Sequence, residues 1–268
     1  MAHKIKHILF VVEGIERDLG IINNLSAVFF NHRCDITCLC IPADMNIYML
    51  YNLLKKDDFE TDVVEVLREK VPLAKEKLDG KARDDFAEVY FFFDFYEHAN
   101  NVYRANNLDV LNEMLEKLDN ETEMGKLYIS YPMIEAARDY VANHCETISG
   151  DCFRSQNEFG SYKNDSGKNQ DHNDIRKYDY VRWNEIIMCY VNRVSCLFEL
   201  NFLDRNLFVK TITPLSLFEK EKQFYLKDEK VFILSCLPEF LIDYSEKYWI
   251  NAIKNRKKPF KKRSCKFK

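Results

Sequence analysis

The sequence predicts an α/β fold: a mostly parallel four-stranded sheet flanked by helices, with a helical region at the C-terminal end. Short apolar runs rich in β-branched and aromatic residues alternate with segments of helical apolar spacing over residues 7–143. That alternation is typical of successive βαβ units. The runs are also continuously apolar, as in parallel strands buried on both faces. Beyond residue 180 helical spacing dominates, which predicts the helical region.

The first βαβ unit lies near the N-terminal end. Residues 7–12 (HILFVV) are the first predicted strand, which Glu13 and Gly14 end. Residues 16–30 place their leucine, isoleucine, valine and phenylalanine side chains at helical spacing, so they predict the connecting helix. Residues 35–41 (DITCLCI) then predict the second strand.

Two more helices are predicted before the third strand, over residues 46–55 and 61–70. We expect Thr61 to cap the second of these helices, because a threonine hydroxyl can accept a hydrogen bond from a first-turn N–H group. The same helix should end before Pro72, since proline does not continue a helix.

The third strand has the clearest strand pattern in the chain. It covers residues 88–93 (EVYFFF) and stops at Asp94. An amphipathic helix is predicted over residues 108–118, and the fourth strand over residues 126–130 (KLYIS). Residues 132–143 predict a helix that begins with proline, which the first turn accepts because its N–H groups have no helical partner. Right-handed crossovers between such strands give a mostly parallel sheet.

The pattern changes after this point. Residues 155–177 are polar and carry both signs of charge, so we predict a mobile loop or linker, in which Tyr162 and Lys163 could make a fixed contact. Further helices are predicted over residues 180–198, 215–226 and 237–254.

The chain therefore divides into an α/β domain, a polar linker, a helical region and a basic tail. Their predicted bounds are residues 1–150, 151–179, 180–255 and 256–268. From residue 254 onward there are nine Lys or Arg and no acids, so a net charge of −4 for the chain leaves −4 − 9 = −13 for the rest. This tail, with Phe260 and Phe267 interleaved, could hold a phosphate backbone. A solvated terminus that aids solubility is an equally weighted alternative.

Composition excludes several classes of protein. The 268 residues include 47% hydrophobic residues, 20 Phe and 15 Tyr, which exclude disorder over the whole chain. Only 7 Gly and 6 Pro argue against a loop-rich sandwich or a collagen-like repeat. No apolar run reaches the roughly 18 residues of a membrane span, and no signal peptide is recognisable, so we expect a cytoplasmic protein with no membrane partner.

The nine cysteines do not indicate a disulfide framework, because their number is odd and no export signal precedes them. We expect free and mostly buried thiols. Cys34, Cys38 and Cys40 invite a zinc hypothesis, but no matching His or Cys pair has ligand spacing. Core thiols are therefore the favoured interpretation.

Three acidic residues follow predicted strands. Glu13 follows the first strand, Asp94 the third, and Glu135 lies just past the fourth. In an open parallel sheet, functional groups gather at the carboxyl ends of the strands. Three carboxylates gathered there would repel one another unless a cation neutralised them. Mg²⁺ suits such a site, and it would support metal-assisted attack on a phosphodiester.

Each acid also has a structural alternative. Glu13 and Glu135 could favour the positive ends of the helices that follow them. Asp94 could end its strand through a side-chain turn. Taken singly, these alternatives are the stronger interpretations; three acids after three strands shift the balance toward a shared site.

The same segments resemble TOPRIM domains. Residues 11–18 (VVEGIERD) resemble the Glu-Gly element and residues 91–99 (FFFDFYEHA) the second acidic element. Residues 127–136 (LYISYPMIEA) are similar to the Pro-x-x-Glu step of the RloB-like and OLD-like TOPRIM nucleases of bacterial phage defence. The resemblance covers roughly residues 5–145 and implies a TOPRIM-like, Rossmann-like catalytic domain.

This resemblance implies a Mg²⁺- or Mn²⁺-dependent nuclease with Glu13, Asp94 and Glu135 as metal-binding acids and Glu16 as a further candidate. Members of the family are often controlled by an ABC-type or OLD-type ATPase. The family expects a second acid two residues after Asp94, where this chain has Tyr96, and the next acid is Glu97. The resemblance therefore also allows a degenerate domain that binds without cutting.

Three further residues could contact phosphate. His98 follows the acidic element, Lys126 precedes the fourth strand, and Lys163 lies in the polar segment. Each could stabilise charge on a phosphate group. The alternative for all three is an ordinary solvated surface side chain, and it is favoured.

Two classes of function follow. The first is a metal-dependent endonuclease acting on DNA or RNA, with tRNA among the candidates, as an effector of antiphage defence. The second is a TOPRIM-like scaffold or sensor that binds an ATPase or a phage protein without catalysis. A phosphatase with Asp94 as nucleophile is less favoured, because such enzymes usually place that aspartate after the first strand. A homo-oligomer is compatible with either class.

Overall fold

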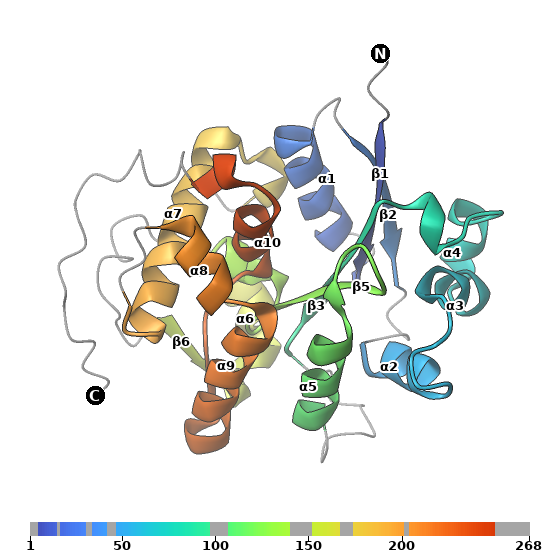
Figure 1. Ribbon diagram of the computed structural model, residues 1–268. Coiled ribbons are helices and arrows are strands. Elements are labelled where there is room, and N and C mark those ends of the chain that lie inside the picture. Colours follow the sequence, from blue (N-terminus) through green and yellow to red (C-terminus); the bar gives the residue numbers. More distant parts are fainter. Residues whose placement is uncertain are drawn as a thin grey trace. The chain divides into compact units, whose positions relative to one another are not determined.

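The computed structural model describes residues 5–14, 17–30, 34–41, 47–96, 107–139, 152–166, 174–200 and 204–249. It has an α/β fold with a five-stranded, mostly parallel sheet of strand order β2-β1-β3-β5-β4, as the sequence predicted in class (Figure 1). The chain forms two compact units. The first comprises Met1–Phe93 and Glu97–Tyr128, and the second Asp94–Tyr96 and Ile129–Lys268.

The first unit is built around β1 (Lys6–Val12), which pairs in parallel with β2 (Cys34–Cys40) and with β3 (Glu88–Asp94). Val12 pairs with Cys40 on one side and with Phe92 on the other. The apolar part of β1 is fully buried, because strands on both sides and helices on both faces exclude solvent. All three strands confirm the sequence prediction.

Helices cover this sheet on both faces. They are α1 (Arg17–Phe29), α2 (Ile47–Lys55), α3 (Val63–Lys70) and α4 (Pro72–Lys77). Both α1 and α4 pack against β2, and Figure 1 shows them on opposite sides of it. The chain steps from β1 to β2 in one direction and from β2 back past β1 to β3 in the other. Right-handed crossovers therefore place the two connections on opposite faces.

The predicted cap of α3 was wrong by one residue. Asp62, not Thr61, is the N-cap, and its Oδ1 accepts a hydrogen bond of 2.7 Å from Val64 N. Its Oδ2 accepts a second bond of 2.9 Å from Arg83 N in the short 3-10 helix η1 (Arg83–Asp85). Aspartate is favoured because one carboxylate can serve both donors. As predicted, α3 ends before Pro72, which starts α4.

A fifth strand corrects the predicted count of four. After α5 (Asn107–Lys117), the two-residue strand β4 (Asp119–Asn120) pairs antiparallel with β5 (Gly125–Ser130). Gly125 has φ +118°, and a Cβ there would lie 2.5 Å from the Phe91 ring, so the position requires glycine. A two-residue strand carries too little periodicity to be detected in a sequence.

The predicted helix over residues 132–143 was wrong. Residues Ile134–Ala137 form a single 3-10 turn, η2, and residues 140–151 lie outside the described residues. Tyr131 instead forms an isolated antiparallel bridge with Leu234, in which each backbone N–H donates to the other carbonyl. The backbone before η2 is thus paired with a distant segment, and the Pro132 carbonyl accepts from Tyr96 N instead of from a following helical turn.

The predicted polar linker also has more structure than expected. It contains β6 (Phe153–Ser155), η4 (Gln156–Glu158), α6 (Phe159–Asp165) and η5 (Ile175–Lys177). Helix α6 forms because Phe159 and Tyr162 lie three residues apart on one face, and both are buried. The predicted fixed contact at Tyr162 is confirmed, since its hydroxyl donates to Asp139.

The rest of the second unit is helical, as predicted. It contains α7 (Tyr180–Leu197), α8 (Arg205–Thr211), α9 (Pro214–Asp228) and α10 (Cys236–Tyr244). Helix α8 was not predicted. The helix predicted over residues 237–254 was too long, because the backbone is extended at Ser245 and α10 ends at Tyr244. Strand β7 (Lys230–Phe232), which the sequence did not predict, pairs antiparallel with β6.

Six cysteines of the described residues are free, as expected: Cys34, Cys38, Cys40, Cys152, Cys196 and Cys236. Cys189 is an exception to the expectation, since it is disulfide-bonded. It is buried in α7.

Candidate functional site

The turn between β1 and α1 holds the first candidate acid, Glu13. Gly14 N donates a hydrogen bond of 2.9 Å to Asp18 Oδ2 on the first turn of α1. A Cβ at Gly14 would lie 2.7 Å from Asp18 Cγ, so the close approach of this carboxylate requires the glycine. Glu13 is half-buried directly before this turn. The Glu-Gly element is therefore a constrained turn at the carboxyl end of a central strand.

The second candidate acid, Asp94, is the last residue of β3 and lies in the second unit. Its Oδ1 accepts a hydrogen bond of 2.8 Å from Ile134 N, the first residue of η2. The backbone beyond it also pairs: Phe95 N donates to Ser130 O and Tyr96 N to Pro132 O, both within 3 Å. These bonds fix the direction of the Asp94 carboxylate relative to η2.

The third candidate acid, Glu135, is the second residue of η2. Only 1% of its surface is exposed. Because Ile134 N binds Asp94, Glu135 follows directly after the residue that holds the Asp94 carboxylate. The bond from Ile134 to Asp94 thus places η2, the turn that carries Glu135, beside the end of β3.

The described residues bring the three acids together only in part. Asp94 and Glu135 lie in the second unit and Glu13 in the first, so their convergence on one ion stays a prediction. Three further candidates, Glu16, Glu97 and His98, lie outside the described residues.

The residue that replaces the expected second acid has a structural role. Tyr96 packs against an apolar cluster formed by Met133, Ala136, Tyr162 and Ile233. Its ring also meets Phe159 edge to face at 5.6 Å. A carboxylate in this environment would lose hydration without a counter-charge. A tyrosine at position 96 therefore fits the apolar packing around it better than the acid that the resemblance implies.

The two candidate lysines have different surroundings. Lys126 lies on β5 with its Nζ 5.7 Å above the ring of Tyr128, a cation–π contact. Lys163 is exposed on α6, and its backbone carbonyl accepts a hydrogen bond from Arg138. They belong to different units, and contact with phosphate stays a prediction for both.

Two acids that the sequence did not indicate as candidates are fixed by burial or by hydrogen bonds. Asp18 is buried at the start of α1. Asp139 accepts a hydrogen bond of 3.0 Å from the Tyr162 hydroxyl and one of 3.3 Å from Arg154. Burial and the Asp139 charge raise the pKa of Tyr162 well above its usual value. Asp18 had a local signal, because it lies one turn after the glycine it contacts. Asp139 had none, because its partners are distant in sequence.

The candidate acids offer carboxylate oxygens, which are the ligands that Mg²⁺ prefers. Within the described ranges, however, no group of three or more His, Cys, Asp or Glu side chains is arranged to hold a metal ion. The carboxylates of Glu13, Asp94 and Glu135 are thus suitable ligands for Mg²⁺, but that they come together in one site stays a prediction.

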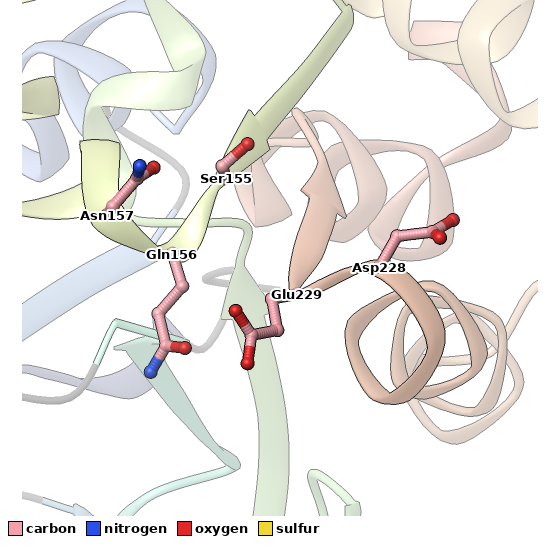
Figure 2. A pocket seen from close by; sticks show the side chains of 5 residues that line it. All are labelled: Ser155, Gln156, Asn157, Asp228 and Glu229. Atoms are coloured by element: carbon pink, nitrogen blue, oxygen red, sulfur yellow. The ribbon is translucent and has the colours of Figure 1, made fainter.

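The second unit also has a pocket of about 400 Å³ where β6 and η4 meet the end of α9. Its lining is polar and comprises Ser155, Gln156, Asn157, Asp228 and Glu229. Figure 2 shows the Gln156 and Glu229 side chains extending to the same side, with Asp228 directed away from them. Gln156 N donates a hydrogen bond of 2.8 Å to Glu229 O, which joins the start of η4 to the end of α9. None of the candidate acids lines this pocket.

Comparisons of the chain with family models, curated proteins and solved structures found no match. Among the helices that the structure describes, none combines the length and apolar character that crossing a bilayer requires.

Proposed function

We propose that this protein is a TOPRIM-like, metal-dependent endonuclease that hydrolyses phosphodiesters of DNA or RNA as an effector of antiphage defence. One observation carries the proposal. Glu13 follows β1, Asp94 is the last residue of β3, and Glu135 lies in η2 just past β5; these three strands are neighbours in the sheet. At the carboxyl ends of neighbouring parallel strands, side chains from separate parts of a chain can serve one reaction.

In this proposal Glu13, Asp94 and Glu135 hold Mg²⁺ or Mn²⁺. The bound metal would orient a water molecule and stabilise the leaving oxygen. The hydrogen bond from Ile134 to Asp94 Oδ1 orients that carboxylate before substrate arrives. Glu97 stands in for the acid that Tyr96 replaces.

Holding the substrate is a separate task. The residues before position 254 carry a net charge of −13, so this part of the protein repels a phosphate backbone. We assign substrate contact to the basic tail, with His98, Lys126 and Lys163 as secondary contacts. An ABC-type or OLD-type ATPase, or a second copy of the chain, would supply further positive surface.

A second function has its own support. Tyr96 packs against an apolar cluster, and Asp94 accepts a hydrogen bond from a backbone N–H group. Both side chains therefore have structural roles that need no bound metal. These contacts favour a TOPRIM-like scaffold or sensor that binds an ATPase or a phage protein without cutting nucleic acid.

The test compares the parent protein with Glu13→Gln and Asp94→Asn on plasmid DNA and on total RNA, with Mg²⁺ and with Mn²⁺. Each variant removes one carboxylate charge and keeps the side-chain size. We expect cleavage by the parent to fall by at least about a hundredfold in each variant. Glu123→Gln, an exposed glutamate of the first unit, is the matched control and should cleave like the parent.

Equal cleavage by all four proteins would exclude these acids as the metal site. No cleavage by the parent, with and without a purified ATPase partner, would leave the scaffold as the supported function.

A further inference from the structure

A buried arginine on α7 joins two distant backbone segments of the second unit. Arg193 is only 8% exposed. Its Nη1 donates a hydrogen bond of 3.0 Å to Ile233 O, directly after β7, and its Nη2 donates one of 3.0 Å to Asp139 O. Asp139 N donates in turn to Ala136 O in η2. One guanidinium therefore ties the end of the η2 segment to the end of β7.

The residue that Arg193 holds is also fixed through its side chain. The Asp139 carboxylate accepts a hydrogen bond of 3.0 Å from the Tyr162 hydroxyl and one of 3.3 Å from Arg154. Tyr162 belongs to the apolar cluster against which Tyr96 packs. Asp139 is thus bound to α6, β6 and α7 at the same time, so the chain has little freedom at this point.

A link that served stability alone would not require a buried cation. Arg193 Nε is buried and, within the part of the chain that the structure describes, has no hydrogen-bond partner. Burying a charged group is unfavourable, and well-packed apolar residues can often replace one without loss of stability. A guanidinium offers what an apolar side chain lacks, namely several donors in a rigid fork. Here the fork sets the positions of two carbonyl groups relative to each other.

The segment held in this way carries one of the candidate acids. Glu135 lies in η2, whose first residue donates to Asp94 Oδ1 at 2.8 Å. Before η2, Tyr131 pairs with Leu234. After η2, the chain is bound by Arg193, whose other donor reaches the carbonyl of the residue before Leu234. The two ends of this segment are therefore fixed to the same short stretch of backbone after β7.

We propose that Arg193 is a positioning residue for the nuclease site. By holding the backbone at Asp139 and Ile233, it fixes η2, and with it the Asp94 and Glu135 carboxylates, in the arrangement that a metal ion meets. This inference rests on the proposed function. Arg193 acts through the backbone in this role and has no assigned contact with substrate or metal.

The first measurement follows η2 without any reaction. Arg193→Met removes the charge and both hydrogen bonds and keeps a long side chain. We expect hydrogen–deuterium exchange of the full-length protein to be at least about tenfold faster over residues 133–139 in this variant. Arg205→Met is the matched control, because Arg205 also donates to two carbonyls, Ile242 O at 2.8 Å and Asp243 O at 2.7 Å, near the end of α10. It should leave exchange over residues 133–139 as in the parent.

The second measurement concerns the site itself. In Arg193→Met we expect kcat for nucleic-acid cleavage to fall by at least about tenfold while KM changes by less than about twofold. Mn²⁺ binding without nucleic acid should weaken in the same variant. Arg193→Lys keeps the charge and some donors, so it should recover part of the kcat and part of the slow exchange. Arg205→Met should keep the kcat and the Mn²⁺ affinity of the parent.

Unchanged exchange over residues 133–139 in Arg193→Met, or an equal acceleration in Arg205→Met, would overturn the inference. Faster exchange with unchanged kcat and Mn²⁺ affinity would also overturn it, because Arg193 would then have a structural role only. A parent protein that neither binds Mn²⁺ nor cleaves nucleic acid would refute the proposed function, whereas the exchange measurement decides separately whether Arg193 holds η2. If circular dichroism shows that Arg193→Met does not fold, Arg193→Lys carries the same comparisons.

Discussion

Glu221 is a carboxylic acid enclosed in the second unit. It is fully buried on α9, and its Oε2 accepts a hydrogen bond of 2.8 Å from Phe232 N on β7. Burial raises the pKa of this carboxyl well above its usual value of 4.5, and the hydrogen bond from Phe232 only partly opposes it. Burial therefore favours the neutral form of the Glu221 carboxyl over the ionised form.

This environment predicts a pH-dependent effect of Glu221→Gln. Above about pH 4.5 the carboxyl ionises in the unfolded chain but keeps its proton in the folded one, so this group lowers the free energy of unfolding as pH rises toward its folded pKa. Glutamine can still accept from Phe232 N and does not titrate. We expect the variant to gain stability relative to the parent between about pH 5 and about pH 8, measured by urea unfolding.

The control for Glu221→Gln is Glu219→Gln, an exposed position on the same helix. Its stability relative to the parent should change little over this pH range. A constant difference between Glu221→Gln and the parent would show that Glu221 is ionised in the folded protein.

At the scale of elements, α3 depends on a residue outside it. Asp62 accepts hydrogen bonds from Val64 N at the start of α3 and from Arg83 N at the start of η1. The two segments are twenty residues apart in sequence and share this one carboxylate. Thr61, the cap that the sequence suggested, is not the N-cap of this helix.

We therefore expect Asp62→Ala to lower the free energy of unfolding by about 1–3 kcal/mol, since it removes a cap and a second backbone hydrogen bond. Thr61→Ala should change it by less than about 0.5 kcal/mol. Urea unfolding of the two variants in parallel measures the difference. Equal losses would mean that Thr61 shares the capping role.

At the scale of the whole molecule, charge is strongly segregated. The net charge of −4 combines +9 in residues 254–268 with −13 elsewhere. If the protein binds nucleic acid as proposed, most of its phosphate contacts come from this short segment. Affinity should then depend on salt through the number of phosphates that the segment neutralises.

Replacing the nine Lys and Arg of residues 254–268 with Gln should weaken binding of a fluorescent oligonucleotide and flatten the slope of log affinity against log salt concentration. A chain without these charges should lose most of that slope, which is about −0.7 to −0.9 per phosphate contact. Replacing the exposed Lys56, Lys70 and Lys75 of the first unit is the control and should have a small effect. An unchanged slope in the tail variant would assign binding to another surface.

The strands and most helices could be predicted because their signals are local. Continuous apolar runs identified β1, β2, β3 and β5, and apolar spacing identified α1, α7 and α9. The position of Glu13, Asp94 and Glu135 after strands followed from the same patterns. Continuous apolar runs and a helical spacing of 3.6 residues can each be recognised within a short stretch of sequence.

The tertiary structure decided what depends on distant partners. Asp94 binds the backbone forty residues later, Tyr131 pairs with Leu234, and β6 pairs with β7, so a predicted helix is a 3-10 turn and a predicted linker is folded. Tyr96, at a position where the TOPRIM resemblance implies an acid, packs against an apolar cluster that no local pattern indicated. Sequence by itself determined the fold class and the strands and helices with strong local apolar patterns, since these follow from apolar spacing. Only tertiary structure decided which side chains are buried or paired, because hydrogen bonds and desolvation depend on neighbours that the local sequence does not contain.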